Sequence, residues 1–262
     1  MNRPETVSSP LNWDRHETTK VPYRVFIDPD IYDLEQQRIF RGATWSFLAL
    51  EAEIPEPFDY KSTFIGDTPV VVTRDAAGLC HAWVNRCAHR GALVCRDLRG
   101  NVREHTCVYH QWAYQPSGEL IGVPFRKGLG GKGGYPADFA PGDHGLHRLK
   151  VQTFKGLVFG SFDPDMVSVE EYLGDTMTRW AGRVLDRTIE FLGTARQQIQ
   201  SNWKLYTENT KDPYHASLLH LFHATFGVYR SSMGGGCDVG GEHGMHSLLR
   251  SFTIENEDLS EY

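Results

Sequence analysis

The sequence predicts an α+β protein, in which a β-rich module over residues 42–163 precedes a helical segment over residues 164–262. Two observations support this class. From about residue 54 to residue 163, short runs rich in Val, Thr and aromatic residues alternate with turns that contain Gly and Pro. After residue 167, apolar residues recur at helical spacing over longer segments. The chain of 262 residues is long enough for one large domain or two ordinary ones.

An N-terminal arm and helix are expected over residues 1–41, before the module. Residues 1–20 are polar, and DPDIYDLEQQRIF (28–40) predicts a helix with Asp30 as its N-cap. Within the module, a loop rich in Gly and Pro spans 127–145. The expected strands are TWSFLAL (44–50), TPVVVTRD (68–75), LCHAWVNRC (79–87), WAY (112–114), LIGVPF (120–125), KVQTF (150–154) and GLVFGSF (156–162).

After the module, the sequence predicts an amphipathic helix at 168–185 and a strand, TIEFLGTARQQIQ, at 188–200. A helix over 202–226 is expected to break at Lys211–Asp212, because a residue before proline avoids the α region and Asp212 precedes a proline. The last forty residues predict no definite element. Because this segment has helices but few strands to cover them, we expect the chain to be shortened at its C-terminus.

Composition excludes several classes of protein. A net charge of −6 argues against a nucleic-acid binder, and no apolar run approaches the roughly 18 residues that a membrane helix needs. The polar N-terminus lacks the apolar segment of a secretory signal. Five cysteines in no regular framework fit a reducing cytosol, where clustered Cys and His indicate metal binding. We therefore expect a soluble cytoplasmic protein that binds neither nucleic acid nor a membrane.

Two mixed Cys/His pairs lie close together in the sequence, as C-A-H at 87–89 and C-V-Y-H at 107–110. Two cysteines and two histidines could hold a single zinc ion, although zinc fingers usually pair Cys with Cys and His with His. A Rieske [2Fe–2S] cluster accounts for the mixing, because one iron takes two thiolates and the other takes two neutral imidazoles. The spacing favours such a cluster over zinc or a chance grouping. Its ligands would be Cys87, His89, Cys107 and His110.

The neighbouring residues are predicted to have structural roles. Cys95 is expected to be a small buried residue, and Trp112 and Tyr114 are expected to pack around the cluster. His81 and His105 are expected on the surface or in strands rather than as ligands. Rieske proteins of respiratory complexes carry a further cysteine in each loop, joined as a disulfide. The absence of that pair here favours the oxygenase or ferredoxin type.

A second group of candidate ligands lies in NWKLYTENTKDPYHASLLH (202–220). Two histidines and a carboxylate form the ligand set of non-haem Fe(II) oxygenases. His215 and His220 are about 140° apart on an ideal helix, so they share a metal only if the helix is distorted. On geometry alone His220 and His223 are better spaced. The structural alternative remains that Asp212 caps a helix and that the histidines are interior residues.

Over nearly its whole length the sequence resembles the large (α) subunit of Rieske non-haem iron aromatic ring-hydroxylating oxygenases. The resemblance rests on NRCAHRGA, CVYHQWAY, GVPFRKG and NWKLYTENTKDPYHASLLH. It is greatest to the members that act on aromatic carboxylates, such as the salicylate, anthranilate and terephthalate enzymes. It implies a Rieske domain at 42–163, followed by the N-terminal part of a helix-on-antiparallel-sheet catalytic domain at 164–262.

The resemblance also implies residue roles. The four Cys and His residues of the two pairs would ligate the cluster, and His215 and His220, rather than His223, would bind a mononuclear Fe(II). Asp212 would bridge to the Rieske histidine of a neighbouring subunit, and Asn209 would orient the site. The family's third iron ligand is a carboxylate that would lie beyond residue 262. Glu257 and Asp258 lie too early to match it.

The implied activity is hydroxylation of an aromatic carboxylate with O₂, in a homotrimer or an α₃β₃ assembly with a small β subunit. Electrons would come from NAD(P)H through a reductase and usually a ferredoxin. The sequence does not fix the substrate, mono- against dioxygenation, or the presence of a β subunit. The alternatives are a Rieske-type electron-transfer protein, an inactive fragment without a complete mononuclear site, and a zinc protein. A carrier would need only the first module, and a zinc protein would be colourless.

Overall fold

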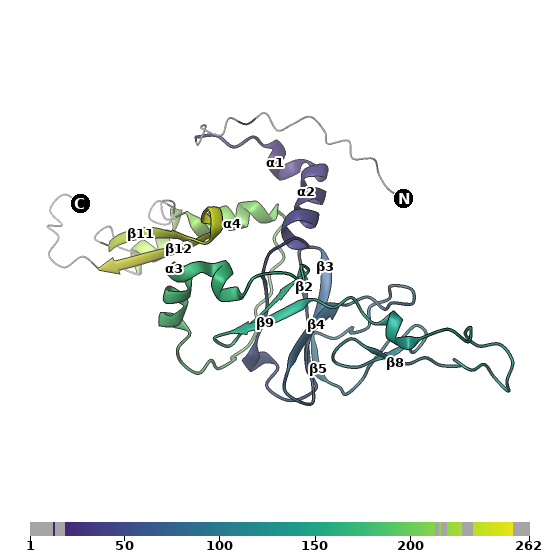
Figure 1. The fold of residues 1–262 in the computed structure, drawn as a ribbon. Helices are drawn as coiled ribbons and strands as arrows, with labels where there is room; N and C mark the ends of the chain where they lie inside the picture. The colour runs from purple at the N-terminus through teal and green to yellow at the C-terminus, as the bar shows by residue number, and fades with distance from the viewer. Residues whose placement is uncertain (1–12, 14–18, 213–214, 216–218, 227–232, 254–262) are drawn as a thin grey trace, which may run out of the picture. The chain divides into compact units, whose positions relative to one another are not determined.

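The computed structural model describes residues 13, 19–212, 215, 219–226 and 233–253 (Figure 1). Its helices and its strand-rich sheets confirm the predicted α+β class. The chain divides into two compact units. The first comprises 33–169 and 184–193, and the second comprises the described parts of 1–32, 170–183 and 194–262. The predicted domain boundaries after residues 41 and 163 stay a prediction.

The first helices of the chain are short. They are α1 (Arg24–Ile27) and α2 (Pro29–Glu35), which continues into a π-helical turn, η1 (Gln36–Phe40). The carboxylate of Asp28 accepts the backbone N–H of Asp30 at 2.9 Å. The prediction of Asp30 as the N-cap is therefore wrong, and Asp28 takes that position. Proline suits the first helical position because its missing N–H would have no partner there, so the helix begins at Pro29.

Three small antiparallel sheets form the first unit, in the orders β1-β10-β9, β4-β3-β2-β5 and β6-β7-β8. Their strands are β1 (Ser46–Leu50), β2 (Asp59–Ile65), β3 (Thr68–Arg74), β4 (Cys80–Val84), β5 (Arg99–Asn101), β6 (His105–Thr106), β7 (Ala113–Tyr114), β8 (Leu120–Gly122), β9 (Lys150–Phe154) and β10 (Leu157–Ser161). Single 3-10 turns lie at η2 (Glu51–Glu53) and η3 (Pro141–His144). Each of the seven predicted strand segments contains a strand, whereas β2, β5 and β6 were not predicted.

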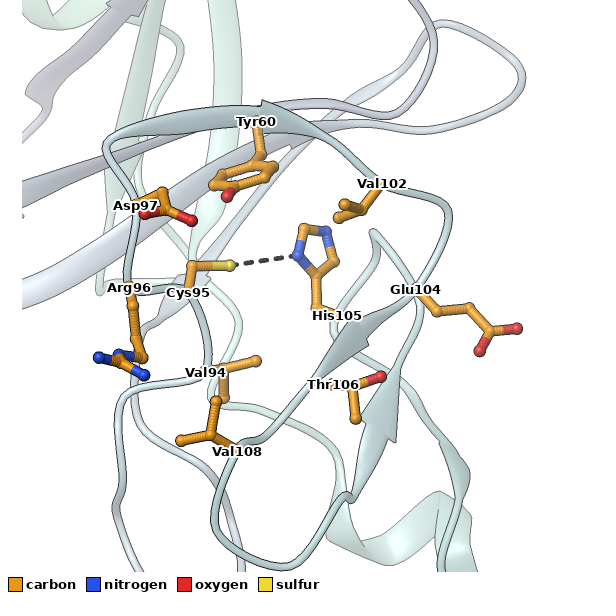
Figure 2. Close-up of a pocket in the computed structure, with 10 residues that line it drawn as sticks. All are labelled: Tyr60, Val94, Cys95, Arg96, Asp97, Val102, Glu104, His105, Thr106 and Val108. Carbon is orange, nitrogen blue, oxygen red and sulfur yellow. Dashed lines mark hydrogen bonds between the residues drawn. The ribbon is translucent and has the colours of Figure 1, made fainter.

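Strand β3 has buried side chains on both of its faces. Val70 and Val72 pack into one hydrophobic core, and Val71 packs into a second. This follows from the strand period of two, which points successive side chains to opposite faces. The second core also contains Cys87 and Cys107, so β3 supports the predicted ligand loops directly. Beside this core the surface opens into a pocket of about 490 Å³ (Figure 2).

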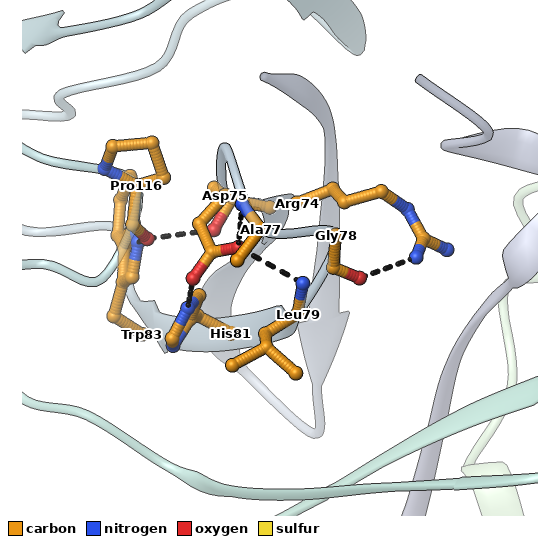
Figure 3. A network of polar contacts seen from close by, with 9 residues as sticks. Arg74, Asp75, Ala77, Gly78, Leu79, His81, Trp83 and Pro116 are labelled. Carbon is orange, nitrogen blue, oxygen red and sulfur yellow. Dashed lines mark hydrogen bonds and ion pairs between the residues drawn. The ribbon is translucent and has the colours of Figure 1, made fainter. Parts of the chain in front are cut away.

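Asp75 organises the turn between β3 and β4 (Figure 3). Its carboxylate accepts the backbone N–H groups of Ala77 and Leu79, each at 2.9 Å, and lies 2.8 Å from Nε2 of His81. Burial alone would raise the pKa of Asp75. The bonds from His81 and the two N–H groups outweigh it and hold the pKa below its usual value. His81 is thus a half-buried strand residue with a structural partner.

The Asp75→Asn variant is expected to have a free energy of unfolding at pH 7 that is about 0.5–1 kcal/mol lower than that of the unaltered chain, because it loses the charge that faces His81. The pKa of Asp75 is lower in the folded chain than in the unfolded chain. Its contribution is therefore present above the usual value of 3.8 and is lost as the pH falls through the folded value. Urea unfolding at pH 7 and pH 3 measures this. A difference between the two proteins that is equally large at pH 3 would contradict the charge-based explanation.

Three helices and a hairpin complete the described chain. They are α3 (Val169–Val184), α4 (Trp203–Lys211), α6 (Leu221–Thr225) and the pair β11 (Met233–Gly240) and β12 (His246–Thr253), with a 3-10 turn, η4 (Glu242–Gly244), between the two strands. Helix α3 is interrupted at Gly174, where φ is 72°. Helix α4 ends at Lys211 because Asp212 is extended, with φ −85° and ψ 106°, which confirms the predicted break. None of the described helices is long and apolar enough to cross a membrane.

One expectation for this part of the chain was wrong, and one element was not predicted. Residues 188–200, predicted as a strand, form no strand. A strand needs a neighbour for its backbone groups, and within the described ranges no other segment pairs with this one. The region of the last forty residues, for which no element was predicted, contains the β11–β12 hairpin. Glycine is depleted in strands, so the Gly-rich MGGGCDVG (233–240) did not indicate one.

Candidate metal centres

The two Cys/His loops have the same backbone hydrogen-bond pattern. In the first loop, after β4, the N–H of Cys87 donates to the carbonyl five residues on, and its carbonyl accepts the N–H of Gly91, both at 2.8 Å. In the second loop, between β6 and β7, Cys107 makes the same two bonds, the second of them with Gln111, both at 2.9 Å. The residue four positions after each cysteine is left-handed, with φ of 73° at Gly91 and 55° at Gln111. The loops are thus two copies of one conformation.

These loops bring the predicted cluster ligands together. Cys87 and Cys107 are buried in the same core, and Cys107 is near enough to raise the pKa of the Cys87 thiol. The ring centroids of His89 and His110 are 4.5 Å apart, and Nδ1 of His89 is buried without a hydrogen-bond partner. Two adjacent thiols and two adjacent imidazoles are the donor set of a Rieske cluster, so the residues present fit this group.

Burial also sets the protonation of these side chains. It raises the pKa of the Cys87 thiol, against the lowering effect of the Tyr114 hydroxyl. It lowers the pKa of His89, and the nearby His110 and Arg90 lower it further. The Cys87 thiol is therefore protonated without metal and would release its proton on binding iron, whereas the His89 imidazole is already neutral as ligation requires.

Two aromatic residues pack against the ligands, as predicted. The ring of Trp112 stacks on that of His89, with centroids 4.9 Å apart and planes 7° apart. The hydroxyl oxygen of Tyr114 accepts the N–H of Ala88 at 3.1 Å and lies 3.1 Å from Sγ of Cys87. Because that oxygen already accepts from Ala88, its own proton is available to the sulfur. Burial and the contact with Cys87 raise the pKa of Tyr114, so the hydroxyl remains a donor.

Cys95 and His105 form a buried pair beside the loops. Sγ of Cys95 lies 3.2 Å from Nδ1 of His105. Burial, with a smaller contribution from Asp97, raises the pKa of Cys95 to about 12, and burial lowers that of His105 to about 4. Both groups are therefore uncharged near neutral pH. Cys95 is buried as predicted, and His105 is in strand β6 but not on the surface. Nothing in the sequence indicates that the two meet.

Asp212, His215 and Asn209 lie together where α4 ends. Oδ2 of Asp212 is 3.2 Å from Nδ1 of His215, and Nδ2 of Asn209 is 3.1 Å from Nε2 of the same ring. The first approach has the length of an ion pair but not the geometry of a hydrogen bond, since Nδ1 lacks a hydrogen-bond partner. The ring centroids of His215 and His220 are 5.1 Å apart. The side chain of His223 lies outside the described residues.

In the part of the chain that the structure describes, no three Cys, His, Asp or Glu side chains converge to hold one metal ion. For the second centre it means that Asp212, His215 and His220 do not form a three-ligand site by themselves. Glu257 and Asp258 lie outside the described residues.

Comparison with known families agrees with the first centre. Residues 44–141 match the family model of the Rieske [2Fe-2S] domain. The chain therefore contains a Rieske [2Fe–2S] domain. Its sequence is similar to the large subunits of aromatic ring-hydroxylating dioxygenases, as its motifs predict.

These relatives are similar over most of this chain. This chain is 54% identical over 253 residues to the anthranilate 1,2-dioxygenase large subunit of Burkholderia cepacia, and the aligned residues cover 97% of this chain and 60% of that protein. It is 47% identical over 242 residues to the terephthalate 1,2-dioxygenase terminal oxygenase component subunit alpha 2 of Comamonas sp., covering 91% and 59%. The crystal structure of naphthalene 1,2-dioxygenase from Rhodococcus sp. bound to indole matches with a TM-score of 0.71 and 34% identity, over 86% of this chain and 54% of that one. The chain thus spans about 60% of the length of these two curated relatives.

Proposed function

We propose that this chain belongs to the terminal oxygenase of a multicomponent system that hydroxylates an aromatic carboxylate. A Rieske cluster on Cys87, His89, Cys107 and His110 would receive single electrons, and a mononuclear Fe(II) on His215 and His220 would supply the O₂ chemistry. The observation that carries the proposal is the pair of matching loops, which place two thiols and two imidazoles side by side. The predicted domain boundaries remain part of this proposal.

The names of the relatives support the proposed substrate class. Those named for anthranilate, terephthalate and salicylate are each named for an aromatic carboxylate. Around the second iron, the carboxylate of Asp212 would hold the ring of His215 through Nδ1 and so leave Nε2 for the metal. Nε2 cannot accept a bond from Asn209 and bind iron at once, so the amide must move away when iron binds.

Electrostatics supports an acidic electron donor. Residues 85–135 contain eight of the 27 Lys and Arg residues but only three of the 33 Asp and Glu residues. The rest of the chain contains 19 Lys and Arg residues and 30 Asp and Glu residues. A basic region around the cluster of an acidic protein would steer a negatively charged carrier to that place. We propose a ferredoxin or reductase as this donor, drawing on NAD(P)H, and a homotrimer or α₃β₃ complex as the assembly.

Charge reversal at the exposed Arg90 is expected to slow reduction of the cluster roughly three- to tenfold at low ionic strength, with a smaller effect at high salt. Stopped-flow mixing with the reductase and ferredoxin of a related dioxygenase measures the rate of reduction. Lys155→Glu makes the same change of charge in the turn between β9 and β10 and serves as the control. Equal rates for the two variants would count against a docking surface on the ligand loops.

The Tyr114→Phe variant is expected to lower the midpoint potential of the cluster by about 40–80 mV. The hydroxyl donates to a ligand sulfur, and this bond strengthens when the reduced cluster carries more negative charge. A gain of about 1–2 kcal/mol in that bond corresponds to this range for one electron. Redox titration followed by EPR measures the potential. An unchanged potential would mean that the hydroxyl does not donate to the sulfur.

The proposed function is tested by iron analysis of anaerobically purified protein, together with EPR after dithionite reduction. Three irons per chain, a Rieske signal and substrate-dependent O₂ uptake are the expected result for a complete oxygenase. Two irons with a Rieske signal would leave the chain as an electron-transfer protein or an inactive fragment. Folded protein with no Rieske signal would overturn the proposal, and zinc in place of iron would identify the structural alternative.

A further inference from the structure

We propose that Asn85, Cys95 and His105 form a clasp that holds the two ligand loops at a fixed separation, independently of the metal. The inference rests on the proposed function, because it concerns the loops that carry the proposed ligands. None of the three residues is itself a proposed ligand. They are positioning residues that connect the first loop to the second on a route that does not pass through the cluster.

Asn85 closes the first loop. Its Oδ1 accepts the N–H of Val94 at 3.0 Å and that of Cys95 at 2.9 Å, while its Nδ2 donates to the carbonyl of Cys95 at 2.8 Å. The side chain is buried, so these bonds do not compete with water. Asn85 lies two residues before Cys87. The amide therefore joins the two ends of the segment 85–95 that carries the first two ligands.

The bond from Cys95 to His105 crosses from this segment to the second loop (Figure 2). His105 begins strand β6, two residues before Cys107. Tyr60 and Trp83 meet its ring edge-on, with centroid separations of 5.3 and 5.2 Å. These two rings and the strand limit how far the imidazole can turn. The thiol–imidazole contact thereby fixes the distance between the loops.

Packing alone does not account for this polar pair. Nε2 of His105 is buried without a hydrogen-bond partner, which costs stability that a phenylalanine ring of similar shape would not lose. The pocket of about 490 Å³ is lined by both Cys95 and His105, so close packing does not hold the loops together on that side (Figure 2). The pair therefore contributes a defined geometry where packing is incomplete.

The clasp is tested with Cys95→Ala, His105→Phe and the double variant. The phenylalanine keeps an aromatic ring against Tyr60 and Trp83 and removes the two polar ring nitrogens. Cys80→Ala is the matched control, since Cys80 is a half-buried thiol on β4 outside the ligand loops. The readouts are the rate at which the visible absorbance of the cluster is lost in EDTA and the EPR g values of the reduced protein. Circular dichroism verifies that each variant is folded.

Each single variant is expected to lose its cluster roughly fivefold faster than the unaltered chain and to show shifted g values, with Cys80→Ala unchanged. The double variant should lose it no faster than the quicker single variant, because both changes remove the same bond. Retention in His105→Phe equal to that of the unaltered chain would overturn the proposal, and so would additive effects in the double variant.

A second variant covers a failure to fold. Should Cys95→Ala not fold, Cys95→Ser supplies a hydroxyl at the same place. Its cluster loss should then fall between the rates of the unaltered chain and His105→Phe, and a rate equal to that of His105→Phe would contradict the bond. Failure of the proposed function is recognised separately, because the unaltered chain would itself then lack a Rieske spectrum.

Discussion

The Cys107→Ala variant is expected to contain no [2Fe–2S] cluster, with iron and acid-labile sulfide at background and no Rieske EPR signal. Its thiol lies in the same buried core as that of Cys87, and one iron would need both. That iron would keep a single protein ligand in the variant. The second loop offers no other thiol to replace it. Metal and sulfide analysis of anaerobically purified protein measures the loss.

The control for this prediction is Cys80→Ala, which removes a half-buried thiol from β4 and should keep its full iron content. Removing one sulfur atom from the core lowers the free energy of unfolding by about 1 kcal/mol. Cys107→Ala should therefore still fold and show the far-UV circular dichroism of the unaltered chain. A normal Rieske spectrum from folded Cys107→Ala would show that the proposed ligand set is wrong.

The Asp212→Asn variant is expected to reduce substrate-dependent O₂ uptake by the complete oxygenase about 10- to 100-fold, with the Rieske signal unchanged. The carboxylate lies 3.2 Å from Nδ1 of His215 and would orient this ring and increase its basicity as an iron ligand. The uncharged amide of the variant would not increase the basicity of the His215 ring. Oxygen-electrode rates and EPR on the same preparation separate the two centres.

Glu208→Gln removes an exposed carboxylate from the same helix, α4, and is expected to leave the rate of O₂ uptake unchanged. Iron analysis of Asp212→Asn distinguishes a lost metal from a blocked reaction. Uptake at the unaltered rate would exclude Asp212 from the route between the centres and leave it with the capping role that its place before a proline also allows.

The strands and the first centre could be predicted because their signals are local. TPVVVTRD (68–75) is rich in β-branched residues, and each ligand loop carries its Cys and His within four residues. Strands β2, β5 and β6 were not predicted, because DYKSTFI (59–65) lacks clear alternation and the other two are three residues or fewer. Their pairing depends on partners that are distant in the sequence.

The contacts between side chains could not be predicted in the same way. Cys95 and His105 are ten residues apart, and only the return of the chain through β5 and β6 brings them together. The second centre was predicted from residue types and a resemblance. The pairing of His220 with His223, which ideal helix geometry favours, stays a prediction, because the side chain of His223 lies outside the described residues. The extended backbone at Asp212 ends α4, and the ring centroids of His215 and His220 lie 5.1 Å apart.

The two-faced burial of β3 has a consequence for how the module melts. A strand whose alternate valines belong to two cores cannot release one of them and keep the other, since either loss exposes the same backbone. The two cores should therefore unfold together in a single calorimetric transition, and the midpoint of this transition should rise when the cluster is bound. Loss of iron would then also lower the melting temperature of the core that contains Val70 and Val72, although the contacts in that core would not change.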